Sequence, residues 1–465
     1  MKPKNFPLVT LLLLLFASLS VWAQLGDTDV SSFTVQNLSG STATIDVTFY
    51  AENGTSYHPS FLDAANTVAN PISLANGLSK QINVSQISTS SLPAGRYAVV
   101  LSSDVQIFAQ AGLGGDTATL RFSGAYIGFS SGATTVYLPS VAYNYYGWYS
   151  MVTVQNIGSS ATKVTATFTC ASGTTGTLEL ASLPANSSVT WPFKTTTPTG
   201  FTAGSTQCDG SAKIESTGIG SNAAQPIVVI NNQNQPGTGA TNSFEGSSTG
   251  ATKLYVTSLS NNFYGWSSAL TIRKLLAGNT TVTVDYSGAW PNSTCNLTDA
   301  VPSCKLVMPA IQPTTGRYSA VLTTNNSYPL LAIIGTTNGG LSGAVRAIDS
   351  STATNTVAAP NVAKSYYGWG SAITCQNVST TPTTLHVEYA GYAANAYNTA
   401  TTLNEGESTQ IVLSTESFLP ASGWQGGVTV TANAAGALIG CVVGNTNSGS
   451  AKAGDWTVSY NAFNK

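Results

Sequence analysis

Charged side chains are scarce in this sequence: Asp, Glu, Lys and Arg together make up 8% of its 465 residues, against roughly 25% in ordinary soluble domains. The formal net charge is −2, which argues against nucleic acid as a partner because phosphate binding needs a basic patch. Low net charge also permits close self-association, since little repulsion keeps two copies apart.

Histidine is nearly absent as well, with His58 and His386 as the two examples. A Ser or Cys nucleophile needs a neighbouring base, usually histidine, but His386 falls on the polar face of an expected strand and His58 in a loop. The acidic residues recur at no fixed position, so no carboxylate pair for glycoside hydrolysis is indicated. We therefore predict a protein that is not an enzyme, with no catalytic residue, no metal site and no cofactor; a calcium site between domains is left open.

Long apolar runs are confined to the N-terminus. Lys2 and Lys4 precede an apolar run over residues 8–17, and small residues follow up to Ala23. This order is typical of a secretory signal peptide, which predicts residues 1–23 as signal and Gln24 as the first mature residue. The alternative is an uncleaved membrane anchor, for which the run is short, since a span needs about 20 residues. We expect a secreted, extracellular protein with no membrane span after signal cleavage, held at the cell surface by association.

A repeated aromatic motif is the strongest internal signal. Its three copies are Tyr145-Tyr146-Gly147-Trp148, Phe263-Tyr264-Gly265-Trp266 and Tyr366-Tyr367-Gly368-Trp369. An alternating strand follows each copy and ends in Gln155-Asn156, Arg273-Lys274 or Gln376-Asn377. A fourth strand of this kind, ending in Gln36-Asn37, lies first in the chain without the motif, and Asp29 stands in place of the tryptophan.

Further strands repeat with the same order. Residues 45–49, 164–168, 282–286 and 385–389 alternate apolar and polar side chains, the pattern of half-buried strands. The sequence predicts an all-β protein of four tandem immunoglobulin-like β-sandwich domains, with residues 24–131, 132–251, 252–353 and 354–465 as the domains. The linkers near Ser131, Ala251 and Ala353 are short, which predicts an elongated, semi-rigid rod.

The pattern resembles a group of secreted bacterial tandem β-sandwich repeat proteins, whose repeats carry Tyr-Gly-Trp, then a strand ending in Gln-Asn, and close near a Ser-Tyr-Asn-Gly-Phe-like segment. Ser459-Tyr460-Asn461-Ala462-Phe463 fits that closing segment. The third repeat, with Arg273-Lys274, and the first, without Tyr-Gly-Trp, depart from the pattern. The resemblance implies extracellular localisation and a repetitive β architecture, with no catalytic activity.

Six cysteines fall in pairs in the last three repeats, and an exported chain permits disulfides. A metal site is the alternative, but the sequence has no Cys-x-x-Cys spacing and too few histidines for zinc. The placement favours the pairs Cys170–Cys208, Cys295–Cys304 and Cys375–Cys441. We expect the last pair to bridge the two sheets through the core and to contribute roughly 4 kcal/mol by closing a long loop.

The aromatic motif has two interpretations. Its residues (Tyr145, Tyr146, Trp148, Phe263, Tyr264, Trp266, Tyr366, Tyr367 and Trp369) either form a stacking platform for sugar rings or seal the end of the sandwich or its joint with the preceding domain. The structural interpretation has the greater weight here.

The expected function is that of an extracellular structural protein, a subunit of a fibre, sheath or surface layer that self-associates through its β domains. The first repeat lacks a counterpart of the strand at residues 135–139, so its sheet edge is open to strand addition from another chain, unless the insertion between Ser56 and Leu74 seals it. The alternative function is a cell-surface adhesin or carbohydrate-binding protein that uses the Tyr/Trp clusters, with a glycan as its partner.

Overall fold

The structure is a computed structural model that describes residues 9–16, 28–60, 68–117, 119–288, 290–421, 423–447 and 453–465, with side chains from residue 31 onward. Strands make up nearly all of its regular structure, so the predicted all-β class is confirmed. None of the helices in these residues is long and apolar enough to cross a membrane.

The described strands form eight sheets, and four apolar cores each take most of their side chains from two of them. We call each pair of sheets a unit and number the units in chain order. In units 2, 3 and 4 one sheet, sheet I, holds the first, sixth, third and fourth strands side by side. Sheet II holds the fifth, second and seventh strands, followed by the eighth strand in units 2 and 3 and the ninth in unit 4. That each unit folds as a separate domain stays a prediction.

The strands of units 1 and 2 lie in the first half of the chain. Those of unit 1 are β1 (Val9–Phe16), β2 (Thr28–Asn37), β3 (Ala43–Ala51), β4 (Ser56–Tyr57), β5 (Ile72–Leu74), β6 (Ser79–Asn83), β7 (Arg96–Ser103), β8 (Ile107–Asp116) and β9 (Leu120–Ile127), with a 3₁₀ turn at Val84–Gln86. Those of unit 2 are β10 (Thr135–Tyr143), β11 (Tyr149–Asn156), β12 (Thr162–Cys170), β13 (Thr175–Leu183), β14 (Ser188–Pro192), β15 (Cys208–Thr217), β16 (Ile227–Asn234) and β17 (Thr241–Glu245).

The second half of the chain repeats this order. Unit 3 contains β18 (Lys253–Asn261), β19 (Ser267–Lys274), β20 (Thr280–Tyr286), β21 (Ser293–Leu297), β22 (Ser303–Val307), α1 (Met308–Ile311), β23 (Gly316–Thr324), β24 (Leu330–Asn338), β25 (Leu341–Arg346) and β26 (Ile348–Asp349). Unit 4 contains β27 (Thr356–Lys364), β28 (Trp369–Asn377), β29 (Leu385–Tyr389), β30 (Tyr397–Asn398), β31 (Ser408–Val412), β32 (Trp424–Ala432), β33 (Ile439–Asn447), β34 (Ala453–Gly454), β35 (Thr457–Asn461) and β36 (Phe463–Asn464), with 3₁₀ turns at Ala393–Asn395 and Leu413–Thr415.

Burial follows the alternation seen in the sequence. Every second side chain of β12 is buried and the others are half-buried, and β3, β20 and β29 show the same period of two. Each of these strands is the third of its unit and turns one face to the core. The predicted alternation is therefore confirmed for these strands.

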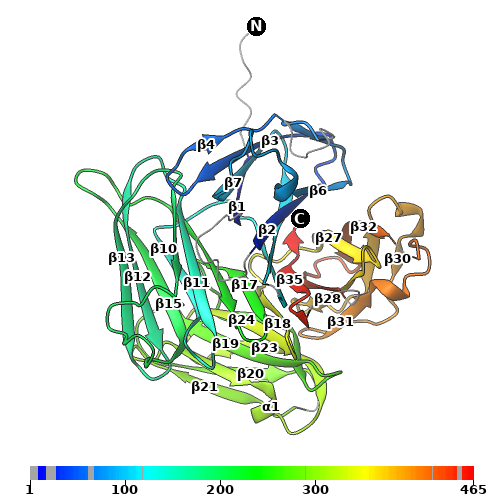
Figure 1. The fold of residues 1–465 in the computed structure, drawn as a ribbon. Helices are drawn as coiled ribbons and strands as arrows, with labels where there is room; N and C mark the ends of the chain where they lie inside the picture. Colours follow the sequence, from blue (N-terminus) through cyan, green and yellow to red (C-terminus); the bar gives the residue numbers. More distant parts are fainter. Residues whose placement is uncertain are drawn as a thin grey trace.

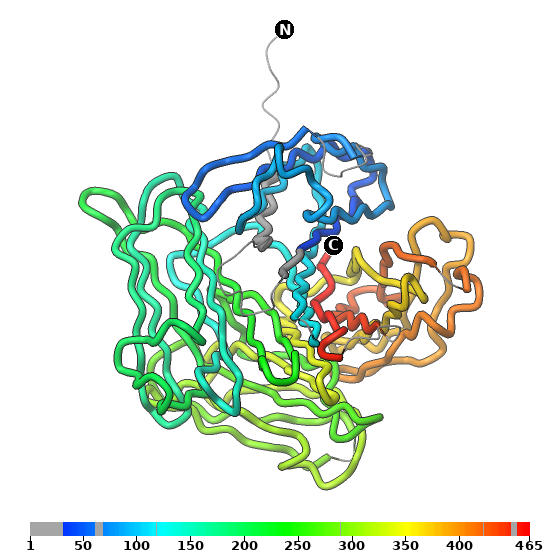
Figure 2. The backbone as a smooth tube through the Cα atoms, in the orientation of Figure 1, coloured from blue at the N-terminus to red at the C-terminus, as the bar shows by residue number. Residues whose placement is uncertain are grey.

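The four units form a closed, compact arrangement, and the predicted elongated rod is wrong. Figures 1 and 2 show unit 4 returning to lie beside unit 1, with the C-terminus next to the blue strands. Strands β9, β17, β25 and β35 occupy equivalent places in their units, and we call them the eighth strands, leaving β5 and β34 uncounted. They lie in the middle, and each contacts the eighth strands of two other units. β34 extends the closure because it pairs in parallel with β9 of unit 1.

Small residues explain why these strands approach so closely. A methyl group at Gly124 would overlap Ser243 of the next unit, and one at Gly343 would overlap Ser459. Short linkers therefore lead to a closed ring here, because Gly and Ser on the eighth strands allow the units to pack side by side.

Asp455 lies at the centre of this closure, and it is one of the acidic residues that recur at no fixed position in the sequence. Its carboxylate accepts the N–H of Thr241 at 2.9 Å and of Thr457 at 2.9 Å, and its own N–H donates to Arg121 O at 2.7 Å. Burial raises the pKa of Asp455 well above its usual value, opposed by hydrogen bonds from the backbones of Ser342, Thr241 and Thr457. One fully buried side chain thus joins backbone groups of several units.

The Asn residue that ends each second strand is buried and structural. Asn156 donates to the carbonyls of Ser160, Leu183 and Pro184 at 2.8–3.0 Å, and its Oδ1 accepts the N–H of Gly158 at 2.9 Å. Asn37 and Asn377 make equivalent bonds. In unit 3, Lys274 takes this place and donates to Leu276 O and to Asp299.

The six cysteines form Cys170–Cys208, Cys295–Cys304 and Cys375–Cys441, the pairs that the sequence analysis gives. The expectation that Cys375–Cys441 bridges the two sheets is wrong, because these residues lie opposite each other on neighbouring strands of one sheet. Cys295 and Cys304 instead join β21 to β22, which belong to different sheets of unit 3.

Candidate binding site at the aromatic turns

Each aromatic motif forms the tight turn that leads from the first strand of its unit, in sheet I, to the second strand, in sheet II. In unit 2, Trp148 N–H donates to Tyr145 O at 2.9 Å and Tyr145 N–H donates to Trp148 O at 3.2 Å. The two residues between them have positive φ, 47° at Tyr146 and 79° at Gly147, as in a type I′ turn. Units 3 and 4 repeat this geometry.

The middle tyrosine of each turn has a backbone conformation that suits it poorly. The φ values of Tyr146, Tyr264 and Tyr367 are 47°, 51° and 47°, in the left-handed region that costs an L-residue with a Cβ roughly 1–2 kcal/mol. Asn-Gly is the favoured pair in such turns. The same unfavourable residue at three equivalent tips indicates a role beyond making the turn.

These tyrosines are also exposed: Tyr146, Tyr264 and Tyr367 keep 75%, 85% and 84% of their surface in contact with solvent. Each ring stands edge-on to the aromatic ring before it, with centroids 4.7–4.8 Å apart. The preceding aromatic residue and the tryptophan are half-buried. Each turn therefore presents one exposed ring on a fixed aromatic base.

A side-chain amide from the end of the seventh strand fixes each turn, and sequence reasoning missed these residues. The carbonyls of Tyr146, Tyr264 and Tyr367 accept hydrogen bonds of 2.8, 3.2 and 3.0 Å from Gln235, Asn338 and Asn447. An Asn or Gln recurs at the end of each apolar strand, which is the signal that was available in the sequence.

Each turn borders a cleft between its own unit and the one that follows. The turns of units 2 and 3 line clefts of about 230 and 330 Å³ against units 3 and 4. The turn of unit 4 lines a cleft of about 280 Å³ against unit 1. The predicted joint with the preceding domain is therefore wrong, because the aromatic turn lines a cleft with the next unit in the ring.

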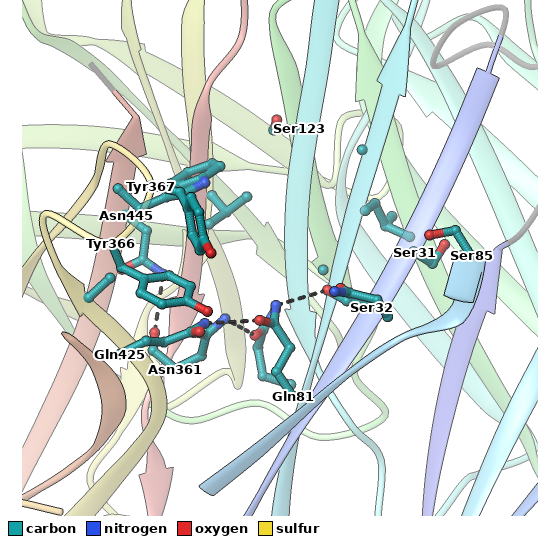
Figure 3. A pocket seen from close by; sticks show the side chains of 18 of the residues that line it. Ser31, Ser32, Gln81, Ser85, Ser123, Asn361, Tyr366, Tyr367, Gln425 and Asn445 are labelled. Atoms are coloured by element: carbon teal, nitrogen blue, oxygen red, sulfur yellow. Dashed lines mark hydrogen bonds between the residues drawn. The ribbon is translucent and has the colours of Figure 1, made fainter. Parts of the chain in front are cut away.

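The cleft between units 4 and 1 is lined mainly by neutral amides and hydroxyls around the aromatic turn (Figure 3). Gln425 donates to Gln81 Oε1 at 3.1 Å and to Asn361 Oδ1 at 2.8 Å, while Asn361 donates to Gln110 Oε1 at 3.2 Å. These bonds connect the two units across the cleft. Ser123 Oγ is buried on the cleft lining without a hydrogen-bond partner.

Figure 3 shows the rings of Tyr366 and Tyr367 on one side of this cleft, with Ser31, Ser32 and Ser85 across from them. Trp369 completes the aromatic side, and its ring centroid lies 6.5 Å from that of Trp456. Amides both donate and accept, as do hydroxyls, so this lining suits a ligand with many neutral polar groups.

Each of the three clefts holds one cation beside an aromatic ring, and in the cleft between units 4 and 1 this is Arg121, 5.1 Å from the ring centroid of Trp456. Lys305 Nζ lies 5.6 Å from the ring centroid of Tyr145 and 3.0 Å from Asp209 Oδ2. Burial, with contributions from Asp209 and Tyr146, raises the pKa of Tyr145. Arg317 lies over Phe263 at 5.5 Å, and burial lowers the pKa of its guanidinium. These cations stack on rings, so the clefts carry little free charge.

The histidines stand apart from these clefts. His58 Nε2 lies 2.6 Å from Asp46 Oδ1, and His386 Nδ1 lies 3.0 Å from Asn398 Oδ1, both in exposed positions. Within the described ranges, no group of three or more His, Cys, Asp or Glu side chains is placed to hold a metal ion. The absence of catalytic activity stays a prediction.

No known protein family model matches the chain, and no curated protein matches it. One solved structure, "Crystal Structure of Thermotoga maritima 1070", is 14% identical, covers 26% of this chain and 91% of that chain, and has a TM-score of 0.18. A similarity this weak carries no argument about fold or function.

Proposed function

We propose that this protein is an extracellular saccharide-binding protein that holds its ligands in the three clefts at the aromatic turns. The observation that carries the proposal is the middle tyrosine of each turn, which is exposed, supported by a second ring and held in an unfavourable backbone conformation. A residue retained three times against its conformational preference is better explained by a ligand than by folding.

The lining supports a neutral, hydroxyl-rich ligand. An aromatic ring offers an apolar face to the C–H groups of a sugar ring, and the surrounding amides can donate to and accept from its hydroxyls. Tyrosine loses little conformational entropy on contact, because it has only two rotatable side-chain bonds. The cleft volumes of about 230–330 Å³ lie near the lower end of the about 300–1,000 Å³ usual for ligand pockets.

Three clefts in one chain favour binding to a repetitive or surface-bound glycan. Once one cleft is occupied, a second contact with the same polymer forms at a high effective concentration, so weak sites give strong overall binding. An adhesin or a carbohydrate-binding surface protein would use this geometry. The three disulfides of this chain indicate an oxidising environment, which supports the proposed secretion and cell-surface location.

The proposal includes the finer architecture, in which each unit is an immunoglobulin-like sandwich domain. The structural role expected from the sequence, as a self-associating subunit of a fibre, sheath or surface layer, remains a second proposal. The specific observation that favours it is the formal net charge of −2 over 465 residues, which leaves little repulsion between two copies.

The experiment is a glycan array probed with the wild-type protein and with the triple variant Tyr146→Asn, Tyr264→Asn, Tyr367→Asn. Asparagine tolerates the left-handed conformation and makes Asn-Gly turns, so the variant keeps its fold while losing the exposed rings. Loss of one well-placed aromatic contact costs about 2 kcal/mol or more, or roughly 30-fold in affinity.

The matched control is Leu276→Asn, which removes an exposed apolar side chain that lines none of the three clefts. We expect the wild type and the control to bind the same saccharides and the triple variant to bind none of them. Equal binding by the wild type and the folded triple variant would refute the proposed site.

A further inference from the structure

Unit 1 differs from the others in the source of its first strand. In units 2, 3 and 4, strands β10, β18 and β27 pair antiparallel with the sixth strands β15, β23 and β32. In unit 1 the equivalent place beside β7 holds β1, in register from Val9 opposite Ser103 to Phe16 opposite Arg96. Figure 1 shows β1 next to β7.

The described strands of the insertion after β3 do not fill this place. Its short strands β4 and β5 both pair with β3, and β3 lies on the side of β7 that faces away from β1. In the described residues the edge is therefore closed by β1 and not by the insertion. The segment Val9–Phe16 is the one strand that completes this edge within the described residues.

This strand lies inside the segment expected to be removed as a signal peptide. Its loss would leave the backbone N–H and C=O groups along one edge of β7 without partners. It would also uncover part of a core in which Val99 and Leu101 of β7 are fully buried. The mature chain would then have an apolar groove, eight residues long, beside β7.

We propose that this groove in the mature chain binds an extended apolar segment of another protein, paired antiparallel with β7. The occupant resembles the strand it replaces: uncharged and almost entirely apolar, as in Val-Thr-Leu-Leu-Leu-Leu-Leu-Phe. A second copy has no such strand to spare among its described residues, because β10, β18 and β27 each pair with a sixth strand of their own unit. Strand addition to an open edge supplies main-chain hydrogen bonds along its whole length.

The groove is separate from the saccharide clefts, so each proposal can fail without the other. A partner strand held here would attach the protein to another surface component. Such an attachment would hold the mature chain at the proposed cell-surface location.

The test uses the secreted protein, whose first residue is established by N-terminal sequencing. A peptide with the sequence of Val9–Phe16, flanked by lysines for solubility, is then added. We expect the melting temperature to rise by several degrees and the amides of Arg96–Ser103 to exchange more slowly with solvent deuterium.

The control peptide carries Leu12→Pro and Leu13→Pro. The N–H groups of successive residues in a strand point to opposite sides of the strand, so one of any two neighbouring residues faces β7. Proline has no N–H group, and the two prolines therefore remove at least one hydrogen bond to β7. We expect at least tenfold weaker binding.

Three results would overturn the proposal. The first is a secreted chain that retains Val9–Phe16, since the groove would then be filled. The second is an equal effect of the two peptides. The third is self-association of the mature chain that the peptide reverses, because the donor would then be a second copy.

Discussion

Replacing Asp455 with alanine tests whether the closed arrangement of units depends on its central carboxylate. The side chain is fully buried and accepts hydrogen bonds from the backbones of Thr241, Ser342 and Thr457. A buried N–H left without a partner costs about 1–3 kcal/mol. With three such groups affected, Asp455→Ala should lower the free energy of unfolding by ~3 kcal/mol or more.

The assay is chemical denaturation followed by tryptophan fluorescence, with Asp104→Ala as the matched control. Asp104 is an exposed acid that accepts a single backbone N–H, from Thr44 at 2.8 Å, so its loss should cost about 1 kcal/mol or less. Hydrogen exchange should show faster exchange at Thr241 and Thr457 in Asp455→Ala alone. Equal stability losses in the two variants would refute the reasoning.

The same residue gives a pH dependence. Burial raises the pKa of Asp455 in the folded state, so the folded protein keeps a proton that the unfolded chain releases at about pH 4. The stabilising contribution is therefore fully present below that pH and is lost as the pH rises through the folded-state pKa. Asp455→Asn removes the titrating group, and its stability should fall less than that of the wild type between pH 4 and neutral pH.

Three further changes have expected outcomes. Replacing Cys375 and Cys441 by serine opens a loop with a sequence separation of 66 residues. This change should lower the free energy of unfolding by about 4 kcal/mol in the loop-entropy model, and an unchanged denaturation midpoint would contradict the expectation. Gly124→Ala should lower the free energy of unfolding by about 1–3 kcal/mol through overpacking. The control Gly370→Ala should have little effect, because a methyl group there meets no neighbouring atom. Equal melting temperatures of the two variants would count against close packing of the eighth strands. Asn156→Ala should lower the free energy of unfolding by about 2 kcal/mol or more, because several buried carbonyls lose their hydrogen-bond donor. Calorimetry would check this, and a change within experimental error would show that water replaces the amide.

Local patterns in the sequence predicted local structure well. The alternation at residues 164–168 appears as alternating burial in β12, because a strand with one face in a core must alternate. The cysteine pairs followed from the placement of two cysteines in each of three repeats. The Tyr-Gly-Trp motif marked three equivalent sites before a second strand, and glycine permits the positive φ that the turn at Gly147 requires.

The contacts between units could not be predicted from the sequence pattern. A rod and a ring can share the same strands, and the choice depends on close approaches such as Gly124 to Ser243, which have no periodic signal. For the same reason the turn at Tyr146 could not be assigned to the following unit. Asp455 gave no sign of burial, because a single acid in a loop is usually exposed.

The segment Val9–Phe16 shows a different limit of prediction from sequence. Its composition predicts an export signal, and apolar runs of this length also suit a buried strand, so composition alone supports both roles. Its pairing with β7 became visible only in the folded chain.

The most direct test of saccharide binding at the aromatic turns is isothermal titration of a saccharide selected on the array against the wild type, each single Tyr→Asn variant and the triple variant. We predict that each single change at Tyr146, Tyr264 or Tyr367 reduces the number of occupied sites or weakens one of them, and that the triple variant releases no binding heat while it melts at the wild-type temperature. Unchanged affinity and stoichiometry in a folded triple variant would contradict the central claim.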